Sequence, residues 1–192
     1  MSTQAKTQEQ TLPADIERLV RERVDAYLQE KEAEKAQRPP KLAIIATKGT
    51  LDWAYPPLIL ATTAAALGWD VGIFFTFYGL NIIHKKKNKH LQVAPVGNPA
   101  MPMPVPNLIG AIPGMTAMGT QVMKWMFNNH HVSSIDELLQ LAVDAGVKMW
   151  PCGMTLEVFG YKQEDFIEGA QQVCGATHFI GYAKDADVSL FI

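Results

Sequence analysis

The sequence contains little cysteine, with two thiols, Cys152 and Cys174, in 192 residues. Two cysteines are too few for the disulfide framework of a small secreted domain, and the polar N-terminus lacks the hydrophobic core of a secretory signal. We therefore expect a cytoplasmic protein, in which a thiol can stay free and reactive. We predict no metal site, because His130 and His131, like Cys174 and His178, lack the second half of a zinc-ligand pattern.

The sequence also has little net charge, at −2, from 17 basic and 19 acidic residues. A general nucleic-acid binder would be strongly basic, so we expect no nucleic-acid partner. Neither a Walker sequence nor a G-x-G-x-x-G fingerprint is present, and we predict no cofactor.

Charge is also scarce between Pro56 and Ile83, where Asp70 is the only charged residue. A stretch of this length and hydropathy is also typical of a membrane-spanning helix. However, Gly68-Trp69-Asp70 divides it into a helix-sized piece and a strand-sized piece. We favour this second interpretation, a buried βαβ unit.

From residue 41 onward, short apolar runs alternate with helical patterns. This alternation predicts an α/β fold with a mainly parallel sheet flanked by helices. The predicted strands are 42–47, 71–77, the run before Cys152, 177–183 and 188–192, and the last lies at or beside a sheet edge. The predicted helices are 56–67, 78–87, 114–127, a capped helix starting at Ser134 and stopping at Gly146, 153–159 and 163–173.

The N-terminal part, residues 1–40, differs from the α/β domain expected over 41–192. Residues 1–10 are polar and predict disorder, whereas residues 12–37 carry apolar side chains at helical spacing until Pro39-Pro40. This helical arm either pairs with another subunit or partner, or lies on its own domain or in solvent.

Two further segments allow more than one interpretation. The run Lys85-Lys86-Lys87-Asn88-Lys89-His90 is either a solvated helix end or a docking patch for an acidic carrier protein. The insertion 93–127 is rich in proline and methionine and nearly free of charge. It suits a subunit interface or a lid, peripheral contact with a membrane, or an ordinary core contribution.

Cys152 follows a short apolar run and precedes a helical pattern, with Pro151 and Gly153 marking a turn. Ligands of open α/β sheets bind outside the carboxyl ends of strands, and amides at a helix start favour a thiolate. We expect Cys152 to be an accessible, ionisable nucleophile, with Gly153, Met154 and Thr155 binding its sulfur adduct. The alternative is a small buried apolar residue.

The second thiol, Cys174, precedes Gly175 at the end of a predicted helix, where the dipole disfavours a thiolate. A structural role is expected, although Cys174 could resolve a disulfide with Cys152 if the fold brings them together.

A separate hypothesis concerns the loop 47–53, which follows the first strand. That loop could bind a phosphate in a non-catalytic, flavodoxin-like module for a nucleotide, flavin or protein partner.

With these motifs in view, the chain resembles the DsrE/DsrF-like sulfur-trafficking family, in a larger subfamily with a Pro/Met-rich insertion. The matching segments lie within residues 41–192: 46–57, 74–81, 97–102, 113–115 and Cys152-Gly153-Met154-Thr155. The N-terminal helix is outside the resemblance. Two related motifs are missing, namely the peroxiredoxin Pro-x-x-x-Thr-x-x-Cys sequence and the Arg-bearing loop of rhodaneses.

The resemblance implies a DsrE-like, flavodoxin-related fold, a homo-oligomer, and a cysteine that carries sulfur as a persulfide or thiosulfonate. That role maps onto Cys152, with Thr50, Asp52 and Tyr78 expected to shape the pocket. The implied partners are rhodanese-like donors, TusA-like carriers and sulfur-oxidising enzymes, and some members are expected at membranes. The resulting hypothesis is sulfur transfer, in which the Cys152 thiolate attacks a donor such as thiosulfate or polysulfide.

Overall fold

The computed structural model describes residues 13–94, 112 and 114–192, and the chain divides between Pro39 and Pro40 into two compact units. The first unit contains helix α1 (Ala14–Ala36), none of whose residues is buried. The helix predicted over 12–37 is confirmed in its described part. Residues 1–10, for which we predicted disorder, lie outside the described residues, as do 95–111 of the insertion.

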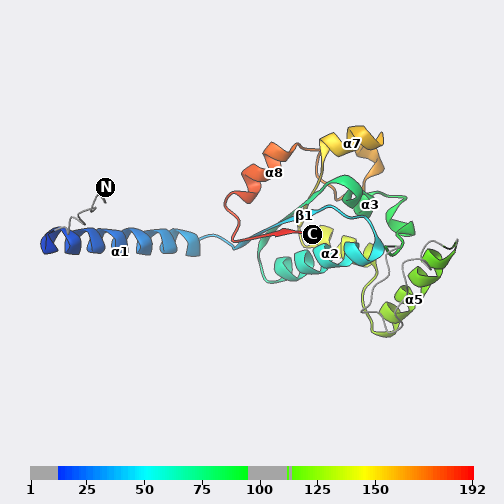
Figure 1. The fold of residues 1–192 in the computed structure, drawn as a ribbon, viewed down its shortest axis with the longest axis horizontal. Helices are drawn as coiled ribbons and strands as arrows, with labels where there is room; N and C mark the ends of the chain where they lie inside the picture. Colours follow the sequence, from blue (N-terminus) through cyan, green and yellow to red (C-terminus); the bar gives the residue numbers. More distant parts are fainter. Residues whose placement is uncertain (1–12, 95–111, 113) are drawn as a thin grey trace, which may run out of the picture. The chain divides into compact units, whose positions relative to one another are not determined.

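The second unit is built on a parallel sheet of strands β1 (Lys41–Ala46), β2 (Asp70–Phe75), β3 (Lys148–Pro151) and β4 (Val188–Phe191). Their spatial order is β3-β2-β1-β4, and all three ladders are parallel. In Figure 1 the colours follow this unit from β1 to the C-terminus. The chain steps outward from β1 to β3 and then crosses back beyond β1, so the strand order reverses at β1. The predicted flavodoxin-like α/β sheet flanked by helices is confirmed.

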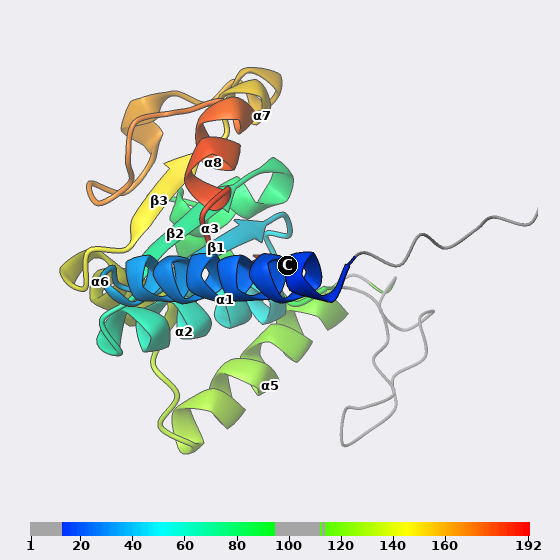
Figure 2. The ribbon, with the colours of Figure 1, turned by 90° about the vertical axis from the view of Figure 1, so that its left-hand side faces the viewer.

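Helices cover both faces of this sheet (Figure 2). One face packs against α2 (Leu51–Ala66) and α6 (Ile135–Asp144), which bury Leu58 and Leu138 beside Ile44 and Ile73. The other face carries a smaller cluster under α8 (Ala176–Ala183), in which the buried residues are Ala43, Phe74, Trp150, Cys152 and Phe179. Alternate residues of β2 and β3 point to opposite faces, so Cys152 continues the side on which Trp150 lies.

The remaining helices are α3 (Leu80–Ile83), α5 (Met115–Asn129) and α7 (Gly153–Phe159), with 3-10 turns at Phe77–Gly79, Asn88–His90 and Gln163–Asp165. The predicted helices after Gly114 and after Cys152 are confirmed. The capping box at Ser134 and the positive φ of Gly146, 73°, also confirm the predicted limits of α6.

The strand predicted over 177–183 is wrong, because these residues form α8. A short apolar run suits a buried strand or a buried helix equally well. Phe179 faces the sheet and stacks on Phe74 with ring centroids 5.0 Å apart, while Tyr182, three residues later, lies against Trp150 at 4.9 Å. A three-residue spacing between side chains on one face is typical of a helix. Packing of both rings against the sheet therefore favours the helix over the strand.

The helix predicted over 163–173 is also wrong beyond the turn Gln163–Asp165. Residues 170–174 instead run parallel to β3, with isolated bridges Met149↔Ala170 and Cys152↔Cys174. The Gln163 side chain accepts a hydrogen bond from the amide of Val173 at 2.8 Å and donates one to the carbonyl of Gln171 at 3.2 Å. This extended segment supplies partners for the outer edge of β3, which a helix could not do.

Two helix boundaries also differ from prediction. Helix α2 begins at Leu51, so Pro56 and Pro57 lie inside it instead of in its first turn. The helix predicted over 78–87 ends at Ile83, because His84 bridges to Phe166 and draws the chain into an extended conformation.

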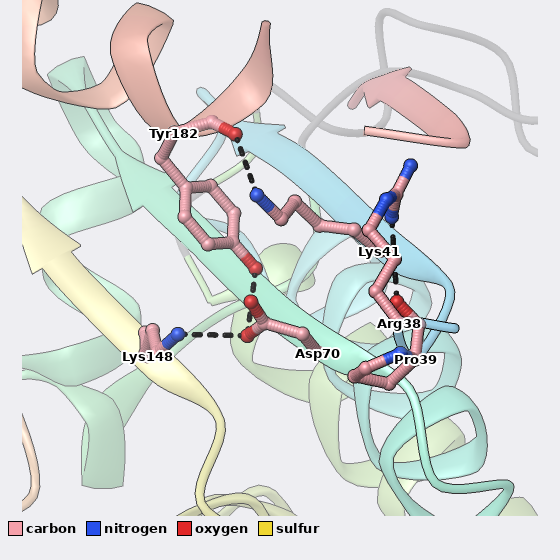
Figure 3. A network of polar contacts seen from close by, with 6 residues as sticks. All are labelled: Arg38, Pro39, Lys41, Asp70, Lys148 and Tyr182. Carbon is pink, nitrogen blue, oxygen red and sulfur yellow. Dashed lines mark hydrogen bonds and ion pairs between the residues drawn. The ribbon is translucent and has the colours of Figure 1, made fainter. Parts of the chain in front are cut away.

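The amino ends of the strands meet in a polar network, shown in Figure 3. The Asp70 carboxylate accepts hydrogen bonds from Lys148 Nζ at 2.8 Å and from the Tyr182 hydroxyl at 3.1 Å. Burial raises the pKa of Tyr182 above its usual range, and the Asp70 carboxylate raises it further. The network therefore joins α8 to the amino ends of β2 and β3, whereas Cys152 lies at the carboxyl end of β3.

The apolar stretch from Pro56 to Ile83 forms most of α2, followed by β2, the turn Phe77–Gly79 and α3, as its division at Gly68 predicted. Within residues 13–94, 112 and 114–192, no helix has both the length and the apolar character needed to cross a bilayer.

Candidate functional site

Cys152 lies at the carboxyl end of β3, immediately before α7. Its amide donates to the carbonyl of Phe75 at 2.9 Å, which extends the β2–β3 ladder by one step. Its carbonyl accepts the amide of Leu156 at 3.0 Å, which begins the helix. The predicted strand-to-helix position of this thiol is confirmed.

The Cys152 sulfur has several hydrogen-bond donors around it. Burial raises the pKa of the thiol, but the backbone and hydroxyl of Thr155, the hydroxyl of Thr76 and the backbone of Met154 together hold it below its usual value. Hydrogen bonds to a charged form favour that form. Because α7 has seven residues, these local bonds, not a long helix dipole, account for the stabilised thiolate.

Thr155 organises this environment. Its hydroxyl is 3.1 Å from the hydroxyl of Thr76 and accepts the amide of Phe77 at 3.2 Å. With the Phe77 amide occupying one lone pair, the Thr155 proton is available to the sulfur or to Thr76. Thr76 was missed by sequence reasoning. The available signal was that it follows β2 as Cys152 follows β3, and parallel neighbours end at the same edge.

The prediction that Cys152 is accessible is wrong, since the residue retains only 4% of its accessible surface. Its neighbours on the α8 face are Trp150 and Phe179, with Cys174 packed against the same cluster. The thiol is therefore ionisable but shielded, and a large reactant could not reach its sulfur without local opening.

The prediction that Cys174 lies at the end of a helix is wrong. Cys174 lies in the extended segment before Gly175, which is the N-cap of α8. Its amide donates to the carbonyl of Pro151 at 3.1 Å, and its carbonyl accepts the amide of Gly153 at 2.9 Å. Cys174 is thus paired directly with Cys152, and both are free thiols. Burial and the nearby Cys152 raise the pKa of Cys174.

The other predicted pocket residues have different contacts in the described structure. Thr50 caps the start of α2 without a side-chain capping bond, and Asp52 accepts the amide of Ala94 at 3.1 Å. Tyr78 is 64% exposed, and its ring stacks on Phe159 with ring centroids 5.6 Å apart. Of the predicted residues, Met154 and Thr155 have the described contacts with Cys152, and Gly153 is the next residue in the chain.

A separate cavity of about 570 Å³ lies beside the loop that follows β1. Its lining includes Thr50, Asn81 and three basic side chains, Lys86, Lys87 and His90. The hydroxyl of Thr50 is buried and has no hydrogen-bond partner among the described residues. This cavity adjoins the point where the strand order reverses, the usual ligand position of open α/β sheets.

A parallel sheet with helices on both faces and a hydrogen-bonded thiol at a strand end defines a flavodoxin-like α/β protein with a cysteine centre. The chain belongs to the DsrE/DsrF/DrsH-like family, whose profile matches residues 38–191. Over 158 residues it is 51% identical to the sulfur carrier protein DsrE2 of Allochromatium vinosum, covering 79% of this chain and 98% of that protein.

Two more distant proteins are also similar to this chain, one in sequence and one in fold. The uncharacterised protein YrkE of Bacillus subtilis is 26% identical over 166 residues, which cover 81% of this chain and 99% of YrkE. The crystal structure of the ychN protein from E. coli superposes with a TM-score of 0.50 at 12% identity, covering 80% of this chain and 99% of that one. The latter similarity concerns the fold alone.

Proposed function

We propose that this protein is a sulfur carrier that holds sulfane sulfur covalently on Cys152, as a persulfide or thiosulfonate, and passes it to a partner protein. The observation that carries this proposal is the set of donors from Thr76, Met154 and Thr155 around the Cys152 sulfur. A thiolate is the reactive form of cysteine, and the same donors suit an anionic sulfur adduct. The 51% identity to a protein named as a sulfur carrier supports the same role.

The chemistry is nucleophilic substitution at sulfur. The Cys152 thiolate attacks the sulfane sulfur of a donor, the donor's own sulfur–sulfur bond breaks, and the bonding electrons leave with the departing group. Because Cys152 is buried, a small donor such as polysulfide, thiosulfate or tetrathionate is expected to load it directly, whereas a protein donor would require local opening of the site.

The partners of this role are other sulfur-relay proteins, rhodanese-like donors and TusA-like carriers, in a cytoplasmic homo-oligomer. Lys85, Lys86 and Lys89 follow α3 as exposed cations, which supports docking of an acidic carrier.

In α5, the apolar side chains of Met118, Val122 and Trp125 are also exposed. They suit a subunit contact or a membrane surface. Light scattering tests the first, and liposome flotation of Trp125→Ala tests the second.

Mass spectrometry of the intact protein tests the carrier proposal. After incubation with polysulfide, thiosulfate or tetrathionate, the wild type should retain a sulfur adduct, and Cys152→Ser should lose it. Loading should decline as the pH falls through the lowered pKa of Cys152, because the thiol then becomes protonated. Equal labelling of the wild type and Cys152→Ser would remove the assignment.

The cavity beside β1 favours a second candidate function, the binding of a phosphate-bearing nucleotide or flavin. The side chains of Lys86, Lys87 and His90 are suited to an anion, as is the Thr50 hydroxyl, which lacks a hydrogen-bond partner in the described part of the chain. Calorimetry with FMN and with ATP tests this function, with Lys86→Ala as the variant expected to weaken binding. Absence of heat with both ligands would exclude it.

A further inference from the structure

The Cys152–Cys174 pair combines a shielded thiol with a more accessible one. Cys152 is buried, whereas Cys174 is only partly buried. A thiol on a partner protein of ordinary size would meet Cys174 first. If Cys152 stores sulfur as proposed above, the burial of the storage thiol leaves open how sulfur passes to a macromolecular acceptor.

The backbone holds the two cysteines side by side. The amide and carbonyl of Cys174 bond to Pro151 and Gly153, the residues on either side of Cys152. Paired strands are about 4.8 Å apart, and directly paired residues project to the same face of a sheet. This agrees with the packing of Cys174 against the cluster that contains Cys152. A persulfide on Cys152 extends its reach by an S–S bond of about 2 Å.

From this arrangement we propose that Cys174 is the exchange thiol of the site, taking sulfane sulfur from Cys152 and presenting it to the thiol of an acceptor protein. The inference depends on the proposed storage of sulfur by Cys152. It assigns a role to the second thiol that simple storage does not require.

The step is a thiol–persulfide exchange. The Cys174 thiol loses its proton to solvent and attacks the outer sulfur of the Cys152 persulfide. A sulfur–sulfur bond to Cys174 forms as the bond to Cys152 breaks, and Cys152 leaves as a thiolate with the bonding pair. The sulfane sulfur keeps its oxidation state, so neither an oxidant nor a reductant is needed.

The stabilisation of the departing group favours this direction. Thr76, Met154 and Thr155 donate hydrogen bonds that lower the pKa of Cys152, whereas burial raises the pKa of Cys174. A thiol of lower pKa leaves faster, so Cys152 is the better leaving group of the pair. An attack on the inner sulfur would instead give a Cys152–Cys174 disulfide and release hydrosulfide.

The test compares the acceptors that can draw sulfur from the full-length protein. Wild type, Cys174→Ser, Cys174→Ala and the neighbouring control Val173→Ala are loaded with inorganic polysulfide and desalted. They are then mixed with cyanide, a small acceptor, or with thiol-bearing dextran, a large one. We expect both Cys174 variants to discharge to dextran at least tenfold more slowly than wild type and Val173→Ala, while discharge to cyanide stays within twofold.

Peptide mapping after alkylation identifies the sulfur positions. We expect persulfide on both the Cys152 and Cys174 peptides of loaded wild type. The exchange role would be overturned if both Cys174 variants discharged to dextran at the wild-type rate. It would also be overturned if the loaded wild type formed a Cys152–Cys174 disulfide and released a stoichiometric amount of hydrosulfide. Undiminished loading of Cys152→Ser would overturn the storage role of Cys152 instead, so the two failures are distinguishable.

Discussion

The ionisation of Cys152 is controlled by a few hydrogen bonds, of which the Thr155 hydroxyl is the easiest to remove. Thr155→Val keeps the shape of the side chain but deletes the donor. A hydrogen bond to a charged group contributes about 1.5–3 kcal/mol, so its loss should raise the pKa of Cys152. The rate of alkylation of the Cys152 peptide against pH measures this change.

Thr155→Ser is the matched control, because it retains the hydroxyl that contacts Thr76 and the Phe77 amide. Its pH midpoint should stay near that of wild type. An unchanged midpoint in Thr155→Val would mean that the backbone donors alone hold the thiolate.

Helix α6 leads into β3 and so determines where Cys152 begins its turn. Its first residue follows a capping box in which the Ser134 hydroxyl accepts the amide of Glu137, and the Glu137 carboxylate accepts the amide of Ser134 at 2.7 Å. Ser134→Ala should lower the free energy of unfolding by about 1 kcal/mol. Urea denaturation measures the loss, and Ser133→Ala, one residue outside the box, should have little effect.

The polar network lies at the amino ends of the strands and the Cys152 thiol at the carboxyl end of β3. A mutation in the network can therefore change the stability of the protein without changing the reactivity of Cys152. Tyr182→Phe removes the hydrogen bond from the Tyr182 hydroxyl to Asp70 while Lys148 stays beside that carboxylate. We expect a loss of about 1 kcal/mol in unfolding free energy. Cys152 alkylation should be unchanged, and a shifted pH profile would show that the network and the thiol are coupled.

The whole chain is proposed to contain an arm, 1–40, and an independently stable α/β domain, 41–192. Helix α1 buries none of its residues, whereas the sheet unit has an extensive core. A protein of residues 40–192 should therefore unfold in urea at the midpoint of the full chain. A midpoint lower by more than about 1 M, or about 1–3 kcal/mol at usual slopes, would mean that the arm stabilises the domain.

Several elements were predictable because their signals are local. β1 and β2 are apolar runs separated by helical spacing, Ser134 and Glu137 form a cap within four residues, and Cys152 stands between a strand and a helix. The 177–183 run was not predictable in this way, because its apolar residues permit a strand as well as a helix. The sheet face beside Trp150 and Phe74 decided between them.

The order of residues was sufficient to establish an α/β fold and a thiol at a strand's carboxyl end, since apolar periodicity and turn residues act over short distances. The fold decided which groups surround that thiol. Thr76 lies near the thiol because it follows β2, the neighbour of β3. Cys174 lies beside it because its segment pairs with the outer edge of β3. These neighbours are brought together by pairing between distant segments, and no local pattern of side chains encodes which segments pair.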